Sequence, residues 1–236
     1  MAPSSIAGLL TLLSLTTSTL AQNPPISTSS TFVLYPYITS GTLTGPYPNS
    51  AIDRSQPLDP SSGRESGTWT TDCFNRFVFT SYIGPTHCTG SEQCGYQRWS
   101  LNATYPGDNG NTLVGYISNL SPMLIGAPDS NGTRDVGWTA SACDNEPKTP
   151  GFSISNAGEE GILHLEYDDG GYGAFGTFFT CWVDGEIYGP RVFYRGEEGA
   201  TPEGCAEVLL VPRCVNETSL AQAPVGSRCY LGGLPA

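Results

Sequence analysis

Basic residues are scarce in this chain of 236 residues. Ten lysines and arginines stand against 22 aspartates and glutamates, Lys148 is the single lysine, and the formal net charge is −12. Nucleic-acid binding needs clustered cations that neutralise phosphates, so the composition argues against a nucleic-acid partner. It equally disfavours binding to an anionic membrane. We interpret the acidic balance as a solubility feature in an acidic medium, where many carboxylates are partly protonated.

Catalytic signatures are also absent. The chain has no Gly-x-Ser-x-Gly motif, no P-loop and no dinucleotide-binding glycine pattern. It has two histidines, His87 and His164, and no Cys-x-x-Cys pair, so a catalytic triad or a zinc site has few candidates. We therefore expect a protein without enzymatic activity, without a cofactor and without a metal site.

No stretch shows sustained helical periodicity, and the 29 glycines and 19 prolines also argue against helices. Short aromatic and β-branched segments instead alternate with turn signals every roughly 8–12 residues. This pattern predicts an all-β, disulfide-stabilised β-sandwich, of which a jelly roll is one form. The expected strands are residues 31–38, 74–82, 97–104, 112–118, 135–139, 152–155, 162–167, 177–183, 187–194 and 208–211.

The first residues are typical of a signal peptide. An apolar run over residues 6–20 ends in Thr19-Leu20-Ala21, which suits signal peptidase, and the run is too short for a membrane span. We therefore predict a secreted, extracellular protein that starts at Gln22. The expected organisation is a signal peptide (1–21), a loose N-terminal arm (22–30), one β-sandwich domain (31–214) and a C-terminal tail clasped by a disulfide (215–236).

Eight cysteines follow the predicted signal peptide. An even number in a secreted chain predicts four disulfides, with 105 possible pairings. Proximity and the expected strands suggest one of these pairings without excluding the others. It joins Cys88 with Cys94, Cys181 with Cys205, Cys214 with Cys229, and Cys73 with Cys143.

Three sequons support the secretory interpretation. They predict N-glycosylation of Asn102, Asn131 and Asn216 on segments that face solvent. A fourth sequon at Asn119 is followed by Pro122, which disfavours its use.

The densest group of chemically active residues lies in the expected strand 162–167 and just after it. His164, Glu166 and Asp168 alternate along the chain, so a strand places them on one face. They could form a metal or acid–base site, and Asp168 with Asp169 could contribute to a calcium site. Alternation by itself favours a simpler interpretation, the solvated face of a half-buried strand.

Two arrangements could serve a carbohydrate. Glu166 and Glu186 on adjacent strands could act as the carboxylate pair of a jelly-roll glycosidase. The four tryptophans could instead form a sugar-stacking platform, although strands also bury aromatic residues, and we favour the core for them. These tryptophans are Trp69, Trp99, Trp138 and Trp182.

The C-terminal half carries a recognisable pattern. It comprises Thr180-Cys181-Trp182, then Gly189-Pro190-Arg191-Val192-Phe193-Tyr194, then the segment 202–212. Over residues 150–212 the chain resembles a family of small secreted fungal (ascomycete) proteins of unknown function, although Arg191-Val192 stands where that family usually has Gln-Leu. The opening Ser30-Thr31-Phe32-Val33-Leu34 is similar too. The resemblance implies a secreted β-protein and supplies no catalytic residue. We expect a cell-wall polysaccharide or an extracellular protein as the partner, and a carbohydrate-binding or host-interacting module is the alternative function.

Overall fold

The computed structural model describes much of the chain and is all-β. The described residues are 24–44, 66–70, 74–79, 98–103, 111–116, 120–139, 149–157, 161–168, 176–183, 190–196, 200–215, 224–231 and 235. They form fifteen strands and no helix, which confirms the predicted fold class. In this part of the chain there is accordingly no apolar helix of membrane-spanning length. The predicted signal peptide and Cys73, Cys88, Cys94 and Cys143 lie outside the described residues.

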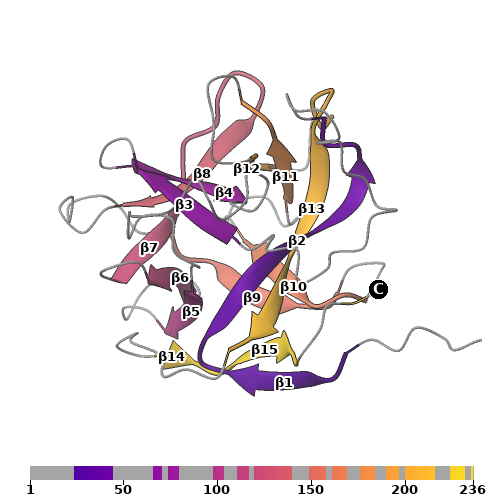
Figure 1. Cartoon of the computed structure of the whole chain (residues 1–236). Coiled ribbons are helices and arrows are strands. Elements are labelled where there is room, and N and C mark those ends of the chain that lie inside the picture. The colour runs from indigo at the N-terminus through magenta and orange to yellow at the C-terminus, as the bar shows by residue number, and fades with distance from the viewer. Residues whose placement is uncertain are drawn as a thin grey trace, which may run out of the picture.

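Figure 1 shows the course of the strands. Those of the first half are β1 (Ile26–Ser29), β2 (Phe32–Gly41), β3 (Ser66–Thr70), β4 (Phe74–Phe79), β5 (Arg98–Ala103), β6 (Asn111–Tyr116), β7 (Leu120–Ile125) and β8 (Thr133–Thr139). Those of the second half are β9 (Phe152–Ser155), β10 (His164–Tyr167), β11 (Thr177–Cys181), β12 (Arg191–Arg195), β13 (Ala206–Cys214), β14 (Pro224–Val225) and β15 (Ser227–Tyr230).

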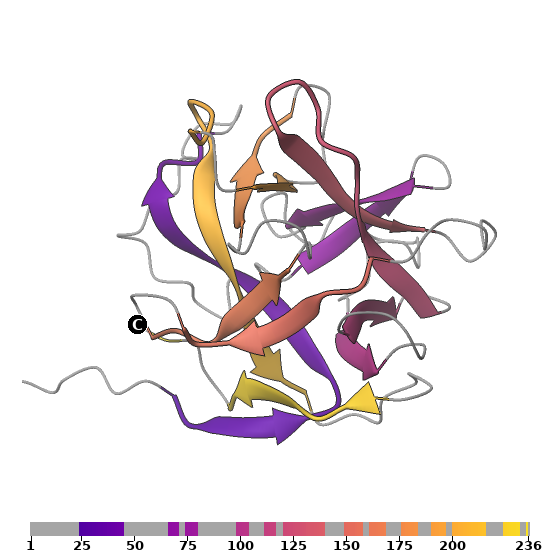
Figure 2. The same cartoon turned by 180° about the vertical axis from the view of Figure 1, so that it is seen from behind.

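All fifteen strands belong to one sheet, with the main order β10-β9-β6-β7-β8-β4-β12-β11-β13-β2-β5-β14. β5 also pairs with β6, β8 pairs with β12, and β2 meets β5 where Phe32 lies opposite Trp99. The pairings therefore run in a closed circuit, and strands lie on both sides of one interior, as in a sandwich. Viewed from behind, β9 and β10 cross in front of β2 and β13 (Figure 2).

The interior is filled by alternate residues of these strands. β13 contributes Ala206, Val208 and Leu210, and β12 contributes Val192 and Tyr194. The residues between them, among them Arg191, Phe193 and Arg195, lie on the other face, because successive side chains of a strand point to opposite sides. The rest of the buried cluster comprises Phe32, Leu34, Ile38, Leu43, Trp99, Leu101, Leu113, Met123, Val136, Phe152, Leu165, Tyr167, Phe178 and Cys229.

The longest ladder joins β2 to β13 and runs from Phe32 opposite Cys214 to Gly41 opposite Ala206. Gly41 has a φ of 77°, and a Cβ there would lie 2.7 Å from the carbonyl oxygen of Cys205. Only glycine fits this close approach of two backbones. The ladder passes through Pro212, opposite Leu34, so the strand expected to end at residue 211 continues to Cys214. The missing N–H of one proline did not end the pairing.

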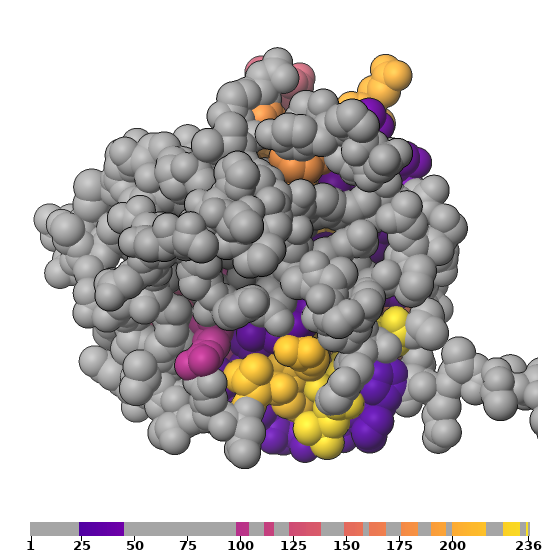
Figure 3. Space-filling model, viewed as in Figure 1, coloured from indigo at the N-terminus to yellow at the C-terminus, as the bar shows by residue number. Residues whose placement is uncertain are grey.

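Residues 26–29, expected within a loose arm, are instead the paired strand β1. They form an antiparallel ladder with β15, and the Leu231 N–H donates to the Pro25 carbonyl oxygen at 2.8 Å. The Ser29 hydroxyl donates to the Val215 carbonyl oxygen at 3.1 Å. These backbone partners come from the C-terminal tail. The arm is therefore held by residues far away in the sequence, since Ser29 and Val215 are 186 residues apart. β1, β14 and β15 gather on one surface (Figure 3).

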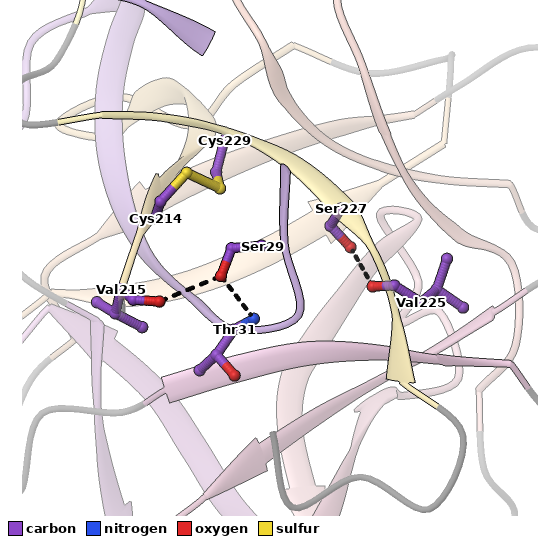
Figure 4. The surroundings of a disulfide bond; sticks show 7 residues. All are labelled: Ser29, Thr31, Cys214, Val215, Val225, Ser227 and Cys229. Atoms are coloured by element: carbon purple, nitrogen blue, oxygen red, sulfur yellow. Dashed lines mark hydrogen bonds between the residues drawn. A yellow bond between two sulfur atoms is a disulfide. The ribbon is translucent and has the colours of Figure 1, made fainter. Parts of the chain in front are cut away.

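Two disulfides join strands, and both belong to the pairing that the sequence suggested. Cys181 of β11 is bonded to Cys205, which precedes β13, and Cys214 of β13 is bonded to Cys229 of β15. Figure 4 shows the second bond beside Ser29, whose hydroxyl accepts the Thr31 N–H at 3.2 Å. Each bond stabilises the fold by about 2–4 kcal/mol, chiefly by restricting the unfolded chain.

Candidate functional site

The first site with ionisable side chains is on β10. His164 and Glu166 are two residues apart and share one face, while Leu165 and Tyr167 pack into the core on the other. The His164 and Glu166 side chains are only 10% and 11% exposed. The prediction that this face is solvated is therefore wrong for His164 and Glu166, although Asp168 is exposed. Alternation identified the shared face, but whether such a face is buried depends on what the fold places over it, which periodicity does not report.

His164 and Glu166 form what we call the His164–Glu166 pair. The ring nitrogen Nδ1 of His164 lies 2.7 Å from the Ile162 carbonyl oxygen, and Nε2 lies 3.3 Å from Oε1 of Glu166. Both ring nitrogens thus face an oxygen atom, which fixes the orientation of the ring. Just before them, the Leu163 N–H donates to the Tyr230 hydroxyl at 2.9 Å, which ties the start of β10 to β15.

Asp168 does not complete a three-residue site with this pair. It lies one residue beyond β10 and is exposed, and its N–H donates to the Gly151 carbonyl oxygen at 3.0 Å. Asp169, its predicted partner in a calcium site, lies outside the described residues. Within the described ranges, no group of three or more His, Cys, Asp and Glu side chains is placed to hold a metal ion.

The second site, which the sequence did not predict, is the Glu207 cluster of Ser40, Arg195, Thr201 and Glu207. The Glu207 carboxylate accepts hydrogen bonds from the Ser40 hydroxyl at 2.7 Å and from the Thr201 hydroxyl at 2.7 Å. It also forms an ion pair with the Arg195 guanidinium. The Arg195 and Glu207 side chains are 13% and 25% exposed. The cluster therefore joins β2, β12, β13 and the segment before β13 through one carboxylate.

These contacts change the ionisation of Glu207. Burial alone acts to raise the pKa of its carboxyl group, because the charged form loses water. The hydrogen bonds from Ser40 and Thr201 and the positive charge of Arg195 outweigh that effect, and the pKa of Glu207 is lower than the usual 4.5. The cluster thus stabilises the carboxylate form. The Nε atom of Arg195 is buried without a hydrogen-bond partner.

The same face of β12 carries a stack of side chains. The Arg191 guanidinium lies 5.0 Å from the centroid of the Phe193 ring and donates to Oδ1 of Asp135 at 2.6 Å. Phe193 in turn stacks on Phe179 of β11 at 5.4 Å with an interplanar angle of 20°. The signal available in the sequence was the alternation Arg191-Val192-Phe193-Tyr194-Arg195, which places two arginines on either side of an aromatic ring on one strand face.

The described tryptophans belong mainly to the core. Trp99 is completely buried and part of the central cluster, which argues against its role in a sugar-stacking platform. Trp182 is partly buried and packs against the same cluster. The side chains of Trp69 and Trp138 lie outside the described ones. Glu186 also lies outside the described residues. Of the predicted carboxylate pair, the structure therefore describes only Glu166.

Two predicted glycosylation sites can be placed. Asn131 is exposed in the turn between β7 and β8, where Oδ1 of Asp129 accepts the N–H groups of Asn131 and Thr133 at 2.8 and 2.9 Å. Asn102 is half-buried within β5, between Thr112 of β6 and Pro224 of β14. Asn216 lies outside the described residues.

Comparison with known families finds one match. A domain of unknown function, DUF7907, matches residues 70–214, more than half of the chain, and the chain belongs to that family. The matched segment includes residues 150–212, where the sequence resembles an uncharacterised family, and extends well upstream of them. Neither the curated proteins nor the solved structures contain a significant match to the chain.

Proposed function

We propose that this member of the DUF7907 family is a secreted, glycosylated extracellular protein that acts by binding rather than by catalysis. The observation that carries this proposal is the pair of disulfides, Cys181–Cys205 and Cys214–Cys229. Structural disulfides persist in oxidising compartments and are rare in the reducing cytosol. Cys214–Cys229 joins the paired strands β13 and β15, and Cys181–Cys205 ties β11 to the residue before its partner β13, so both bonds act as staples of the fold.

The sequons support the same compartment. Asn131 lies in an exposed turn with a hydrogen-bonded backbone, where a glycan has room and meets no neighbouring strand. Asn102 lies within a strand that has partners on both sides, and its glycan would project from the sheet face opposite to the core residue Leu101. We expect Asn131 to be the more completely occupied of these two sites.

The ionisable groups of the His164–Glu166 pair, the Glu207 cluster and the Arg191–Asp135 contact support a role without catalysis. A catalytic carboxylate or imidazole has to reach a substrate. His164 and Glu166 are buried and face each other and the backbone, and Glu207 and Asp135 are engaged by arginines. These groups are committed to interactions within the fold. The partner we propose is a cell-wall polysaccharide or an extracellular protein.

Secretion is tested by expressing the full chain in a eukaryotic secretory host. We expect the protein in the medium, beginning at Gln22, with no alkylatable thiol and with a mass that falls on enzymatic removal of N-glycans. The variant Asn131→Gln should lose one glycan, with Asn119→Gln as the matched control that changes nothing. Retention in the cells with free thiols would contradict the proposal.

Binding is tested by mixing the secreted protein with insoluble chitin, β-glucan, cellulose and xylan and assaying reducing ends in the supernatant. Retention without release supports a binding role for a polysaccharide. Absence of retention directs the search to a protein partner. Release of sugar that is abolished by Glu166→Gln would identify a glycosidase and overturn the non-catalytic proposal.

A further inference from the structure

We propose that Asn131 is a site of self-modification. In chains that carry no glycan there, its side-chain amide reacts with the backbone nitrogen of Gly132 and becomes aspartate or isoaspartate. The glycan predicted at Asn131 blocks this reaction, so the two modifications exclude each other. Only this protective role of the glycan rests on the proposed function. The reaction itself depends on the turn between β7 and β8.

Asn131 differs chemically from the other described asparagines. Among the asparagines that the structure describes, it alone precedes a glycine, whereas the exposed Asn156 precedes Ala157. The other Asn-Gly pair of the sequence, at residues 109–110, lies outside the described residues. A glycine has no side chain to shield its backbone nitrogen, and a Cβ placed at Gly132 would meet nothing within 4 Å. The nitrogen is therefore open to the neighbouring amide.

The turn itself requires this glycine. The Gly132 N–H donates to the Asp129 carbonyl oxygen at 3.1 Å, and the Asp129 N–H donates to the Thr133 carbonyl oxygen at 2.8 Å, which closes the hairpin. Gly132 has a φ of 77°, a conformation that residues with a side chain rarely adopt. The residue that the backbone needs is therefore also the one that leaves Asn131 open to attack.

The reaction consumes only water. The Gly132 nitrogen loses its proton and bonds to Cγ of Asn131. The bond between Cγ and Nδ2 breaks, and Nδ2 leaves as ammonia with that proton. Water then opens the cyclic imide. Its addition at Cγ gives aspartate, and its addition at the main-chain carbonyl carbon gives isoaspartate. A glycan on Nδ2 prevents the first step, because its bulk crowds Cγ and enlarges the leaving group.

Asp129 slows this first step. Its Oδ1 accepts the N–H groups of Asn131 and Thr133 at 2.8 and 2.9 Å, on either side of Gly132. While these bonds hold the turn, the Gly132 N–H stays on the Asp129 carbonyl oxygen and its nitrogen does not reach Cγ. The reaction therefore proceeds from the opened turn, and local opening controls its rate. Asp129 is a positioning residue that acts through the turn.

Isoaspartate would alter the hairpin. It adds a methylene group to the main chain between Asp129 and Thr133, so Oδ1 of Asp129 can no longer accept both N–H groups in this geometry. It also places a second carboxylate beside that of Asp129. Thr133 begins β8 and lies opposite Arg195 of β12, so the change reaches the sheet.

The first test ages the full chain in mildly alkaline buffer and follows Asn131 by peptide mass spectrometry, with isoaspartate detected by an isoaspartyl methyltransferase. Thr133→Ala removes the sequon and keeps Asn131-Gly132, whereas the wild type from a eukaryotic secretory host should carry the glycan. We expect Thr133→Ala to convert Asn131 and to leave Asn156 intact, and the glycosylated wild type to keep both. An unchanged Asn131 in Thr133→Ala, under conditions that convert the urea-unfolded chain, would overturn the proposal.

Two further outcomes separate this inference from the proposed function. A wild type that carries no glycan and converts as Thr133→Ala does would contradict glycosylation and still support the reaction. Conversion of a wild type that carries the glycan would overturn its protective role. If Thr133→Ala does not fold, wild-type chain from a bacterial periplasm, which is oxidising, takes its place, because it carries no N-glycan of this kind.

The second test measures the rate of conversion in Asp129 variants of the unglycosylated chain. Asp129→Ala removes the acceptor that holds the turn, so we expect conversion of Asn131 to be about fivefold faster. Asp129→Asn keeps an acceptor oxygen without the charge and should restore most of the slow rate. Asn156 should be unaffected in both variants. An Asp129→Ala rate equal to that of the parent chain would show that the turn does not control the reaction.

Discussion

The His164–Glu166 pair and the Glu207 cluster differ in how far apart in the sequence their members lie. The pair joins residues two positions apart on one strand. The cluster joins Glu207 of β13 to Ser40, 167 residues away on β2, and to Arg195 of β12, with β11 lying between β12 and β13. The pair would form in any fold that keeps β10 extended. The cluster forms only when these strands lie in this order and register, so it depends on the topology.

The two sites also differ in what happens when the acidic partner is lost. A histidine can release its proton and remain as a neutral ring, whereas an arginine stays charged at any ordinary pH. Removal of Glu207 would leave a positive charge in a largely buried position, and removal of Glu166 would not. The free-energy cost of removing one partner of an ion pair therefore depends on whether the remaining partner can lose its charge.

The largest expected effect comes from breaking the Cys181–Cys205 disulfide, which lies close to the Glu207 cluster along the chain. Cys181→Ser with Cys205→Ser should lower the free energy of unfolding by about 3 kcal/mol, because the unfolded chain regains the freedom of the closed loop. Denaturant unfolding measures this, and Cys214→Ser with Cys229→Ser is a matched control with a similar expected loss. Since Cys205 is two residues from Glu207, we expect a coupling of at least about 0.5 kcal/mol with Glu207→Ala. Strict additivity would show that the disulfide and the cluster act independently.

The next effect contrasts the two acids directly. At pH 7, Glu207→Ala should cost about 2 kcal/mol, because it removes a charge-assisted contact and leaves Arg195 unpaired. Glu166→Ala should cost about 1 kcal/mol, because His164 can become neutral. The exposed Glu203 offers a control, and Glu203→Ala should stay within about 0.5 kcal/mol of the wild type. Equal costs for Glu166 and Glu207 would contradict the distinction.

The Glu207 cluster should make stability depend on pH at the acid end of the scale. The pKa of Glu207 is below the usual 4.5, so its unfolded carboxyl group takes up protons first as the pH falls. Its stabilising contribution is present above pH 4.5 and is lost as the pH falls through the lower, folded value. Glu207→Gln should therefore flatten the acid limb of the stability curve, measured by denaturant unfolding at a series of pH values. An acid limb as steep as that of the wild type would contradict this assignment.

The smallest effect concerns the aromatic stack beside the cluster. Phe193→Leu should cost about 1 kcal/mol, since it removes the ring contact with Phe179 and the contact with the Arg191 guanidinium while keeping an apolar side chain. Thermal or denaturant unfolding measures the loss. A cost above that of Glu207→Ala would show that stacking, rather than charge, holds this face of β12.

Much of the fold was predictable because strands have a local signature. The segments around Phe32–Gly41, Thr177–Cys181 and Ala206–Cys214 are rich in aromatic and branched residues, and each contains a described strand. β7 was not expected, since Pro122 lies inside it, and β1 reads as a polar Ser/Thr segment. Such strands form because a partner edge is present, which is a property of the whole sheet.

The sites show the same limit. The alternation of residues correctly placed His164 and Glu166 on one strand face. It wrongly predicted that solvent surrounds these two side chains, because burial depends on segments from elsewhere in the chain that pack over the strand. The Glu207 cluster could not be predicted at all, since nothing local to Glu207 indicates Ser40. Of the cysteines, those with short separations along the chain, such as Cys214 and Cys229 at 15 residues, were the easier to pair.

The pairing of β1 with β15 and of β2 with β13 determines when the sheet can be completed. β1 and most of β2 leave the ribosome early and find their ladder partners in residues 206–230, near the end of synthesis; of β2, Phe32 also lies opposite Trp99 of β5. These two ladders therefore cannot form as the chain emerges, and β1 and most of β2 lack them until almost the whole polypeptide is available. A chain truncated before residue 206 would keep its first strands and lose the partners that hold them.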